Sequence, residues 1–436
     1  MKYSKDPNNR APFHMNIKRL KGTQDILPIE SGLWQSVERI SRKVFSSYGY
    51  KEIRTPIIEE TRLFARSVGQ ETDIVKKQMY SFLDQGKRDI SLRPEETASV
   101  VRAYIENRLD NTEGFVKLYY MGSMFRSERP QAGRFRQFNQ IGVEAIGSCS
   151  TYLDAETIIL LDNLLKKLGL TKYSFYINSL GCEKDKSNII NILKKELQNR
   201  ISELCDDCKA RYDTNILRVL DCKCDGCKKA VKTISINGIL CQDCEKSFLS
   251  LQEILKSNDV EFTIMPALVR GLDYYTGLVF EVSAGSLGAQ DAIAAGGRYD
   301  NLVSDLGGSK QGAIGFAIGL ERIIRLLSEI SPSSVFNKGV SVFVVTIGEQ
   351  AYKAGFDILY KLRGADIPSD IDYQNKSLKA QMRYADRIKA EYVLIIGEDE
   401  LKQGKVCLKN MSDSSQSDVM LDNIVNEVKK ELSIKN

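Results

Sequence analysis

The stretch YYMGSMFRSERPQAGRFRQFNQIGVE, residues 119–144, predicts a strand, a basic loop and a second strand. Residues 119–125 form an apolar, aromatic run, and side chains of alternating character return in residues 136–144. The loop between them contains a proline and a glycine, which favour turns. Arg126 closes the first strand, where its guanidinium could hold a phosphate with two parallel hydrogen bonds. A hairpin with a solvated basic tip explains the same stretch equally well.

The hydrophobic and charged fractions are ordinary for a soluble globular protein. The 436 residues suffice for two or three domains with full cores. The 62 basic and 57 acidic residues give a formal net charge of +5, which permits nucleic-acid binding without requiring it. No apolar run approaches the length of a membrane-spanning helix, and the N-terminus lacks the apolar core of a signal peptide. We therefore expect a cytoplasmic protein with no membrane segment.

Residues 1–14 differ from the rest of the chain, because they are polar and contain two of its nine prolines. We expect a leader or disordered tail there, with the native start at Met15. His14, the single histidine of the chain, lies in this segment. A body without histidine excludes Ser-His-Asp and Cys-His nucleophilic chemistry and imidazole metal ligands. Catalysis would therefore depend on arginine, glutamate, glutamine, tyrosine and lysine side chains.

A long helix and a proline-interrupted strand are predicted near the start of this body. Apolar residues at helical spacing predict a helix from Ser31 to about Tyr48. Residues 50–58 predict a strand, in which Pro56 requires an edge or a bulge because proline lacks the ladder donor. This helix and strand could form a dimer seam, or they could pack within one chain.

Residues 89–97, DISLRPEET, run from a strand into a loop. Pro94 prevents helix at the preceding residue and presents Glu95, Glu96 and Thr97 at the start of the next helix. A carboxylate at the end of a strand can receive an ammonium group. It can also simply cap the helix, which is the commoner role.

Residues 182–259 are predicted to form a helical, Lys- and Cys-rich insertion in a catalytic domain of residues 15–328. Eight of the ten cysteines fall between residues 182 and 244. Paired Cys-x2-Cys segments in a cytoplasmic protein favour a structural, tetrahedral zinc site over disulfides. The segments Cys205-x2-Cys208, Cys222-x-Cys224-x2-Cys227 and Cys241-x2-Cys244 offer seven cysteines for four places, and reduced cysteines without metal are the alternative. The candidate ligands, four of which would form the site, are Cys205, Cys208, Cys224, Cys227, Cys241 and Cys244.

Three segments follow the insertion. Residues 268–282, LVRGLDYYTGLVFEV, place Arg270 before a turn and a strand. Residues 294–300, AAGGRYD, predict a glycine-rich turn, and residues 311–327 predict a small-residue strand that runs into a helix bearing Arg322. Tyrosine hydroxyls here could bind a polar ring while their faces pack against it. Taken singly, the tyrosines would be core residues and Arg322 a solvated helix arginine.

The C-terminal part is predicted to be a separate α/β unit. Residues 329–338 are a linker by composition. Strands alternate with helices in residues 339–436, which predicts a mostly parallel sheet. No catalytic constellation occurs in this unit. A modest basic face, which fits either solvent or RNA, comprises Lys376, Lys379 and Arg383.

In this order the segments resemble the motifs of class II aminoacyl-tRNA synthetases. Residues 49–58 are similar to the first class motif, a dimer strand that ends in proline. Phe125 to Glu144 resembles the second motif, and GFAIGLER at residues 315–322 the third. The segments that narrow the resemblance to the histidyl-tRNA synthetase family are LRPEET at 92–97, LVRGLDYY at 268–275 and AGGRYD at 295–300.

The resemblance implies the fold, the reaction and the partners. The fold would be α/β: an antiparallel sheet flanked by helices, the Cys-rich helical insertion, and a C-terminal α/β anticodon-binding domain. A homodimer would use ATP with Mg²⁺ to convert histidine to histidyl-adenylate. The histidyl group would then pass to the 3′ end of histidine tRNA. Zn²⁺ would be structural where present, because the paired cysteines occur in only part of the family.

The resemblance also implies residue roles. Arg126 would hold the α-phosphate of ATP and Arg322 the γ-phosphate, with Glu128 in the same ATP site. Arg270 would face Arg126 near the attacking carboxylate. Arg129 and Gln131 would meet the acceptor end of the tRNA. Glu95 and Thr97 would receive the histidine ammonium group, and the tyrosines would surround the imidazole. The implied histidine site comprises Glu95, Thr97, Gln140, Glu144, Arg270, Tyr274, Tyr275 and Tyr299.

Some positions depart from the family pattern. The family often has glycine where Glu96 stands and histidine where Ser127 and Asn139 stand, which puts local loop contacts in doubt. A rival interpretation is a synthetase-like regulatory subunit of ATP phosphoribosyltransferase, which binds histidine without charging tRNA. Such paralogs usually lack the C-terminal domain and part of the phosphate-binding set. This chain keeps both, which favours the synthetase, and LVRGLDYY opposes a prolyl or threonyl enzyme.

Overall fold

The computed structural model describes residues 17–433 except 71, 113, 130–132, 233, 235–237, 286, 288–290 and 331–338. The described residues form two compact units: residues 17–27 with 33–330, and residues 28–32 with 339–433. The expected leader and most of the expected linker lie outside the described residues. No helix in the described part of the chain is long and apolar enough to cross a membrane.

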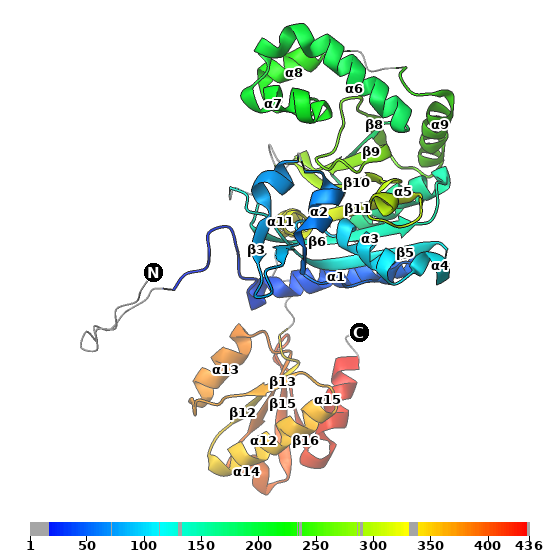
Figure 1. Cartoon of the computed structure of the whole chain (residues 1–436). Helices are drawn as coiled ribbons and strands as arrows, with labels where there is room; N and C mark the ends of the chain where they lie inside the picture. The colour runs from blue at the N-terminus through cyan, green and yellow to red at the C-terminus, as the bar shows by residue number, and fades with distance from the viewer. Residues whose placement is uncertain are drawn as a thin grey trace, which may run out of the picture. The chain divides into compact units, whose positions relative to one another are not determined.

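An eight-stranded sheet forms the body of the first unit (Figure 1). The two strands predicted from residues 119–144 are neighbours in it, and they pair antiparallel with Leu118 opposite Glu144. The interior pairs are antiparallel, and each edge strand pairs in parallel with its neighbour. The order is β1 (Lys51–Glu52), β5 (Val116–Phe125), β6 (Gln137–Ile146), β11 (Ala313–Gly319), β10 (Ala292–Arg298), β9 (Thr276–Ser283), β7 (Ser174–Ser179) and β8 (Phe262–Ile264).

Helices and a second, three-stranded sheet surround this body. The small sheet has the order β2 (Ile58–Glu60), β4 (Asp89–Leu92), β3 (Tyr80–Leu83). Helices α5 and α11 pack on β11, and α11 also contacts β6. The helices are α1 (Pro28–Ser47), α2 (Thr61–Val68), a π-helical turn (Ile74–Gln78), α3 (Thr97–Glu106), α4 (Leu109–Thr112), α5 (Thr151–Lys167), α10 (Leu302–Asp305) and α11 (Leu320–Ile330). The α/β fold with a mainly antiparallel sheet is thus confirmed.

Two elements near the N-terminus differ from the prediction. Helix α1 begins at Pro28 rather than Ser31, because proline is tolerated where the first helical N–H groups lack partners. The single strand predicted over residues 50–58 is wrong. The chain instead forms β1 and β2, which belong to different sheets and lie on either side of Pro56. Proline cannot donate to a ladder, so the chain leaves one sheet before it joins the other.

The glycine-rich turn predicted over residues 294–300 is also wrong, because most of it is strand β10. The glycines are needed for close backbone approach. Gly296 and Gly297 lie opposite Phe316 and Gly315 of β11. A Cβ at Gly296 would overlap the carbonyl oxygen of Gly315. Glycine therefore allows tight strand packing here rather than a change of direction.

The Cys-rich segment is helical, as expected, and its helices α6 to α8 gather at one end of the first unit (Figure 1). Its buried residues, among them Leu193 and Leu197, share one core with Tyr120 and Val279 of the main sheet. Helix α9 packs against α5. The elements are α6 (Glu183–Leu197), 3₁₀ turns at Gln198–Glu203 and Ile216–Val219, α7 (Asp206–Thr214), α8 (Asp225–Lys232) and α9 (Gln242–Ser257).

The second unit is an α/β sheet of mixed direction. Its strand order is β13 (Ser369–Ile371), β12 (Val342–Thr346), β14 (Tyr392–Ile396), β15 (Lys405–Asn410), β16 (Gln416–Met420). Only β12 pairs in parallel, with β13 and β14, so the expected mostly parallel sheet is half right. The connections after β14 are too short for a parallel crossover. The helices are α12 (Glu349–Gly364), α13 (Leu378–Arg387), α14 (Glu398–Lys402), a 3₁₀ turn (Leu421–Asn423) and α15 (Ile424–Ser433).

Candidate active site

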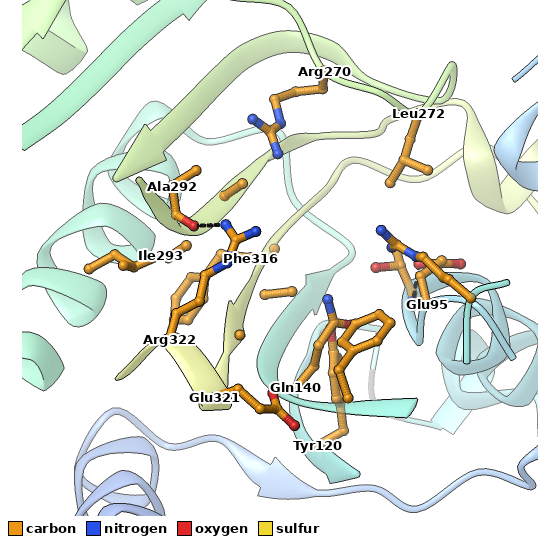
Figure 2. Close-up of a pocket in the computed structure, with 18 of the residues that line it drawn as sticks. Glu95, Tyr120, Gln140, Arg270, Leu272, Ala292, Ile293, Phe316, Glu321 and Arg322 are labelled. Atoms are coloured by element: carbon orange, nitrogen blue, oxygen red, sulfur yellow. Dashed lines mark hydrogen bonds between the residues drawn. The ribbon is translucent and has the colours of Figure 1, made fainter. Parts of the chain in front are cut away.

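One pocket in the first unit collects side chains from strands β5, β6, β10 and β11, from the start of α3 and from the segment before β9 (Figure 2). Arg270 and Arg322 point toward the same space, and Glu95 and Gln140 approach it from other elements. The sequence-predicted residues that line it are Glu95, Thr97, Arg126, Glu128, Gln140, Glu144, Arg270, Tyr274, Tyr275, Tyr299 and Arg322. Segments far apart in the sequence therefore meet as the resemblance implies.

A buried carboxylate, that of Glu144, lies at the inner end of the pocket. Thr97 donates its hydroxyl hydrogen to Glu144 Oε1 at 2.6 Å, and the Tyr299 hydroxyl donates to Oε2. The side chain is 1% exposed, and burial raises the pKa of Glu144 to about 8 despite these two donors. Opposite it in β11 stands Gly315, where a Cβ would overlap a Glu144 carboxylate oxygen. The glycine makes room for this carboxylate.

The Glu95 carboxylate caps helix α3 and lines the pocket at the same time. It accepts the backbone N–H groups of Thr97 at 2.8 Å and Ala98 at 2.9 Å. Burial raises the pKa of Glu95, while these N–H groups and the nearby charge of Arg126 oppose the rise. The capping interpretation and the pocket interpretation of this residue are therefore compatible.

Glu96, where the family often has glycine, is not among the residues that line the pocket. It forms a buried ion pair with Arg93 at 2.7 Å and accepts the Thr55 hydroxyl at 2.7 Å. Burial raises the pKa of Glu96 to about 7. Arg93 also donates to the backbone of Thr55 and Ser123. Through its ion pair with Arg93, Glu96 thus links the segment similar to the first class motif to strand β5.

Three tyrosine rings form the apolar wall of the pocket. The centroid of the Tyr274 ring lies 4.7 Å from that of Tyr275 and 5.7 Å from that of Tyr299. All three side chains are buried. Such tilted and edge-on rings present both faces and hydroxyl groups to a bound ring.

Arginines also line the pocket, and one of them, Arg126, lies close to Glu95. Arg126 donates to the carbonyl oxygen of Pro94 at 2.9 Å and packs over the Phe138 ring at 5.2 Å. Arg322 donates to the carbonyl oxygen of Ala292, the bond dashed in Figure 2. Burial lowers the pKa of Arg126 and Arg322, but guanidinium groups remain charged at neutral pH. The pocket therefore carries fixed positive charge.

Several residues in or beside the pocket were not predicted from the sequence. Glu281 pairs with Arg270 across eleven residues of chain, and Arg134 pairs with Glu128 at 3.2 Å. Glu321 accepts the backbone and side-chain N–H groups of Asn139 at 2.8 and 3.0 Å. Arg134 belongs to the basic loop, whose positive charge is the feature of the sequence that could have indicated this residue. Glu281 of β9 pairs with the segment that precedes this strand, and Glu321 at the start of α11 bonds to β6. Spacing along one segment does not reveal contacts of this kind.

The insertion fixes the segment that carries Arg270 and the tyrosines. Lys186 donates to the carbonyl oxygens of Asp273 and Tyr275, both at 3.1 Å. Arg218 donates to that of Gly271 at 3.1 Å. The Cys-rich helices therefore position the pocket wall from outside.

The structure describes only one of the two residues that are expected to meet the acceptor end of the tRNA. Arg129 is exposed at the start of the basic loop. Gln131 lies outside the described residues. The role expected for both remains a prediction.

The cysteines of the insertion form two groups rather than one. Cys205, Cys208, Cys222 and Cys227 have ligand atoms within 4.8 Å of one another and could hold a metal ion. Cys222 takes the place expected for Cys224, whose side chain is exposed, because spacing alone does not show which way each thiol points. Cys241 and Cys244 lie in the other group, with Cys182 and Asp185.

The antiparallel sheet, with arginines and two buried carboxylates lining its pocket, defines a class II aminoacyl-tRNA synthetase. The family model of histidyl-tRNA synthetases matches residues 22–323, and that of an anticodon binding domain matches residues 341–431. The chain belongs to the histidyl-tRNA synthetase family.

Individual relatives agree. The histidine–tRNA ligase of Halothermothrix orenii is 47% identical over 417 residues, which are 95% of this chain and 100% of the relative. The histidine–tRNA ligase of Thermodesulfovibrio yellowstonii is 46% identical, with 95% and 99% covered. The crystal structure of apo histidyl-tRNA synthetase from S. aureus matches with a TM-score of 0.81 and 36% identity. That match covers 95% of this chain and 100% of the other.

Proposed function

We infer that this protein activates histidine with ATP and transfers the histidyl group to the 3′ end of histidine tRNA. The observation that carries the inference is a single pocket lined by arginines, two buried carboxylates and tyrosines. Relatives that match nearly the whole chain are histidine–tRNA ligases, which disfavours the regulatory-subunit alternative. Histidine-dependent exchange of pyrophosphate into ATP tests the activity directly.

The buried carboxylates and tyrosines of the pocket suit the polar groups of histidine. Glu95 and Thr97 would receive the ammonium group beside Glu144. Gln140 Oε1 is buried and has no hydrogen-bond partner among the described residues, so it offers an acceptor to a ligand. Tyr274, Tyr275 and Tyr299 would enclose the imidazole. These contacts would leave the histidine carboxylate directed at the arginines.

The arginines of the pocket suit the first chemical step. A carboxylate oxygen of histidine attacks the α-phosphorus of ATP; the bond to the bridging oxygen breaks, and pyrophosphate leaves with its electron pair. Arg126 and Arg270 would flank the α-phosphate, with Glu128 beside Arg126, and Arg322 would hold the γ-phosphate. Mg²⁺, which synthetases of this kind use with ATP, would offset phosphate charge. No side chain has to remove a proton, because the attacking carboxylate is already ionised.

The second step transfers the histidyl group. A ribose hydroxyl of the tRNA attacks the carbonyl carbon, the bond to the α-phosphate oxygen breaks, and AMP leaves. A phosphate oxygen of the adenylate would accept the hydroxyl proton. Arg129 and Gln131 would meet the acceptor end. Residues 339–433, which include the basic Lys376, would read the anticodon stem.

We propose that the protein acts in the cytoplasm as a homodimer. Ile57 and Ile58, in the segment similar to the first class motif, are 45% and 49% exposed in the single chain. Burial of this apolar edge against a second copy would remove that exposure. Sedimentation that finds only monomer at micromolar concentration would contradict the dimer.

Histidine binding is expected to tighten as the pH rises from about 7 to about 8.5. Burial raises the pKa of Glu144 to about 8, so this carboxyl is mostly protonated at pH 7. An ammonium group is held better by the ionised form, whose fraction grows roughly eightfold over this range. The KM for histidine in pyrophosphate exchange should fall by a similar factor. Glu144→Gln should abolish the dependence, and a KM of the parent enzyme that stays constant across this range would contradict the role.

Cys205, Cys208, Cys222 and Cys227 are proposed to bind a structural zinc ion. Sγ atoms of Cys205 and Cys222 lie 3.8 Å apart, close to the edge of roughly 3.8 Å of a tetrahedron with Zn–S bonds of about 2.3 Å. Cys222→Ser should therefore lose one equivalent of zinc per chain. Cys224→Ser is the matched control, two residues away, and should lose none. Loss of zinc in Cys224→Ser but not in Cys222→Ser would instead support Cys224 as the ligand, as expected from spacing.

A further inference from the structure

A second group of metal-type ligands lies where the insertion leaves and rejoins the main sheet. Ligand atoms of Cys182, Asp185, Cys241 and Cys244 all lie within 4.8 Å of one another. Two come from the start of helix α6, and two from the start of α9. None of these cysteines forms a disulfide. The group is separate from the Cys205 group and from the active-site pocket.

The two groups use the same local geometry. Cys205 immediately precedes α7, and Cys208 is the third residue of that helix. Cys241 and Cys244 hold the same two positions in α9, and the backbone angles of Cys205 and Cys241 agree, at φ −68° and ψ 163°. This turn directs the side chain before the helix and the one in its first turn to the same side.

Helix α6 repeats this arrangement with one substitution. Cys182 precedes the helix with φ −72° and ψ 179°, and Asp185 is its third residue. Asp185 thus stands where Cys208 and Cys244 stand in the other two helices. The segment is a Cys-x2-Asp counterpart of the Cys-x2-Cys segments, which explains why a search for paired cysteines does not find it.

The Asp185 carboxylate is already oriented toward the thiols. It is 1% exposed and accepts the backbone N–H groups of Cys182 at 3.3 Å and Cys241 at 3.1 Å, one on each oxygen. Each oxygen keeps a further lone pair. A buried carboxylate among three thiols matches a tetrahedral zinc site with three sulfur ligands and one oxygen ligand.

We propose that Cys182, Asp185, Cys241 and Cys244 bind a second zinc ion, which fastens the first helix of the insertion to its last. Binding would release the thiol protons to solvent. The site would also support the active-site wall. Leu180 donates its N–H to the carbonyl oxygen of Gly277 at 2.7 Å, and Gly277 donates to that of Gly181 at 2.9 Å. Lys186, one turn into α6, holds the tyrosine segment as described above.

Metal content of the full-length protein, purified without chelators, tests the proposal. Parent protein should contain two zinc ions per chain, and Cys244→Ser and Asp185→Ala should each contain one. Cys224→Ser, in the same insertion, and Cys149→Ser, in the main body, should retain two. Cys208→Ser should lose only the zinc ion of the Cys205 group. Unchanged zinc content in Cys208→Ser would therefore contradict the Cys205 site alone and would not affect the proposal for the second site.

The loss of zinc in these variants could reflect misfolding rather than loss of a ligand. A variant that exchanges one ligand type for another distinguishes the two. Asp185→Cys would give α6 the same Cys-x2-Cys start as α7 and α9, so it should retain two metal ions. After replacement of zinc by Co²⁺, its thiolate-to-cobalt absorption should increase relative to the parent, because one oxygen ligand becomes sulfur. Full zinc content in Cys244→Ser overturns the proposal. A Cys241–Cys244 disulfide in the parent, found by mass spectrometry with one zinc per chain, overturns it too.

Discussion

Arg270→Ala should lower the rate of histidine-dependent pyrophosphate exchange by roughly 10²- to 10³-fold, the usual cost of removing one donor from a charge-stabilising site. Arg270 enters the pocket from the segment before β9, and its Nε is buried without a hydrogen-bond partner among the described residues. That donor is available to the phosphate or to the attacking carboxylate. Because charge spreads over the α-phosphate oxygens during attack, the loss should appear mainly in kcat.

A second substitution distinguishes loss of the Arg270 guanidinium from the effect of leaving a carboxylate unpaired. Removal of Arg270 leaves the Glu281 carboxylate, its ion-pair partner, unpaired beside the phosphate site. The double variant Arg270→Ala with Glu281→Gln removes that charge as well. If it stays as slow as the single variant, the guanidinium itself is required. Near-normal exchange in Arg270→Ala would show that the arginine has no catalytic role.

Gly315→Ala should lower kcat/KM for histidine by about 100-fold, the effect expected when a binding group is displaced by about 1 Å. A Cβ at this position would overlap the Glu144 carboxylate and the carbonyl oxygen of Val143. The carboxylate would have to leave its bonds to Thr97 and Tyr299, and strands β6 and β11 would have to separate locally. Overpacking of this kind also reduces the free energy of unfolding by about 1–3 kcal/mol.

Gly319→Ala is the matched control in the same strand. The nearest atom that its Cβ would meet is Cδ of Arg322 at 3.9 Å, an ordinary van der Waals contact. It should therefore leave the KM for histidine and the melting temperature close to parent values. Equal effects at both glycines would indicate a general loss of strand flexibility rather than displacement of Glu144.

Local patterns predicted the elements that carry the site. Residues 119–144 became β5 and β6 with the basic loop between them, and LRPEET became the end of β4 and the start of α3. The resemblance supplied what periodicity does not, namely that Glu95, Arg270 and Arg322 share one pocket. Each of these residues alone had an ordinary structural explanation.

What the sequence could not supply depends on contacts between segments. The glycines of β10 looked like a turn, because a local pattern does not show that another strand approaches closely. Spacing favoured Cys224, which forms a Cys-x2-Cys pair with Cys227, but the chain before α8 places Cys222 beside the other thiols. Asp185 as a partner of three cysteines required helices α6 and α9 to be placed side by side.

Histidine-dependent exchange of radiolabelled pyrophosphate into ATP, followed by charging of histidine tRNA, tests the central claim most directly. Histidine should support both reactions, and the other amino acids should support neither. Arg126→Ala should abolish exchange while histidine binding, measured by calorimetry, remains. Histidine binding by the parent protein with neither exchange nor charging would contradict the account and leave a histidine-binding regulatory protein in its place.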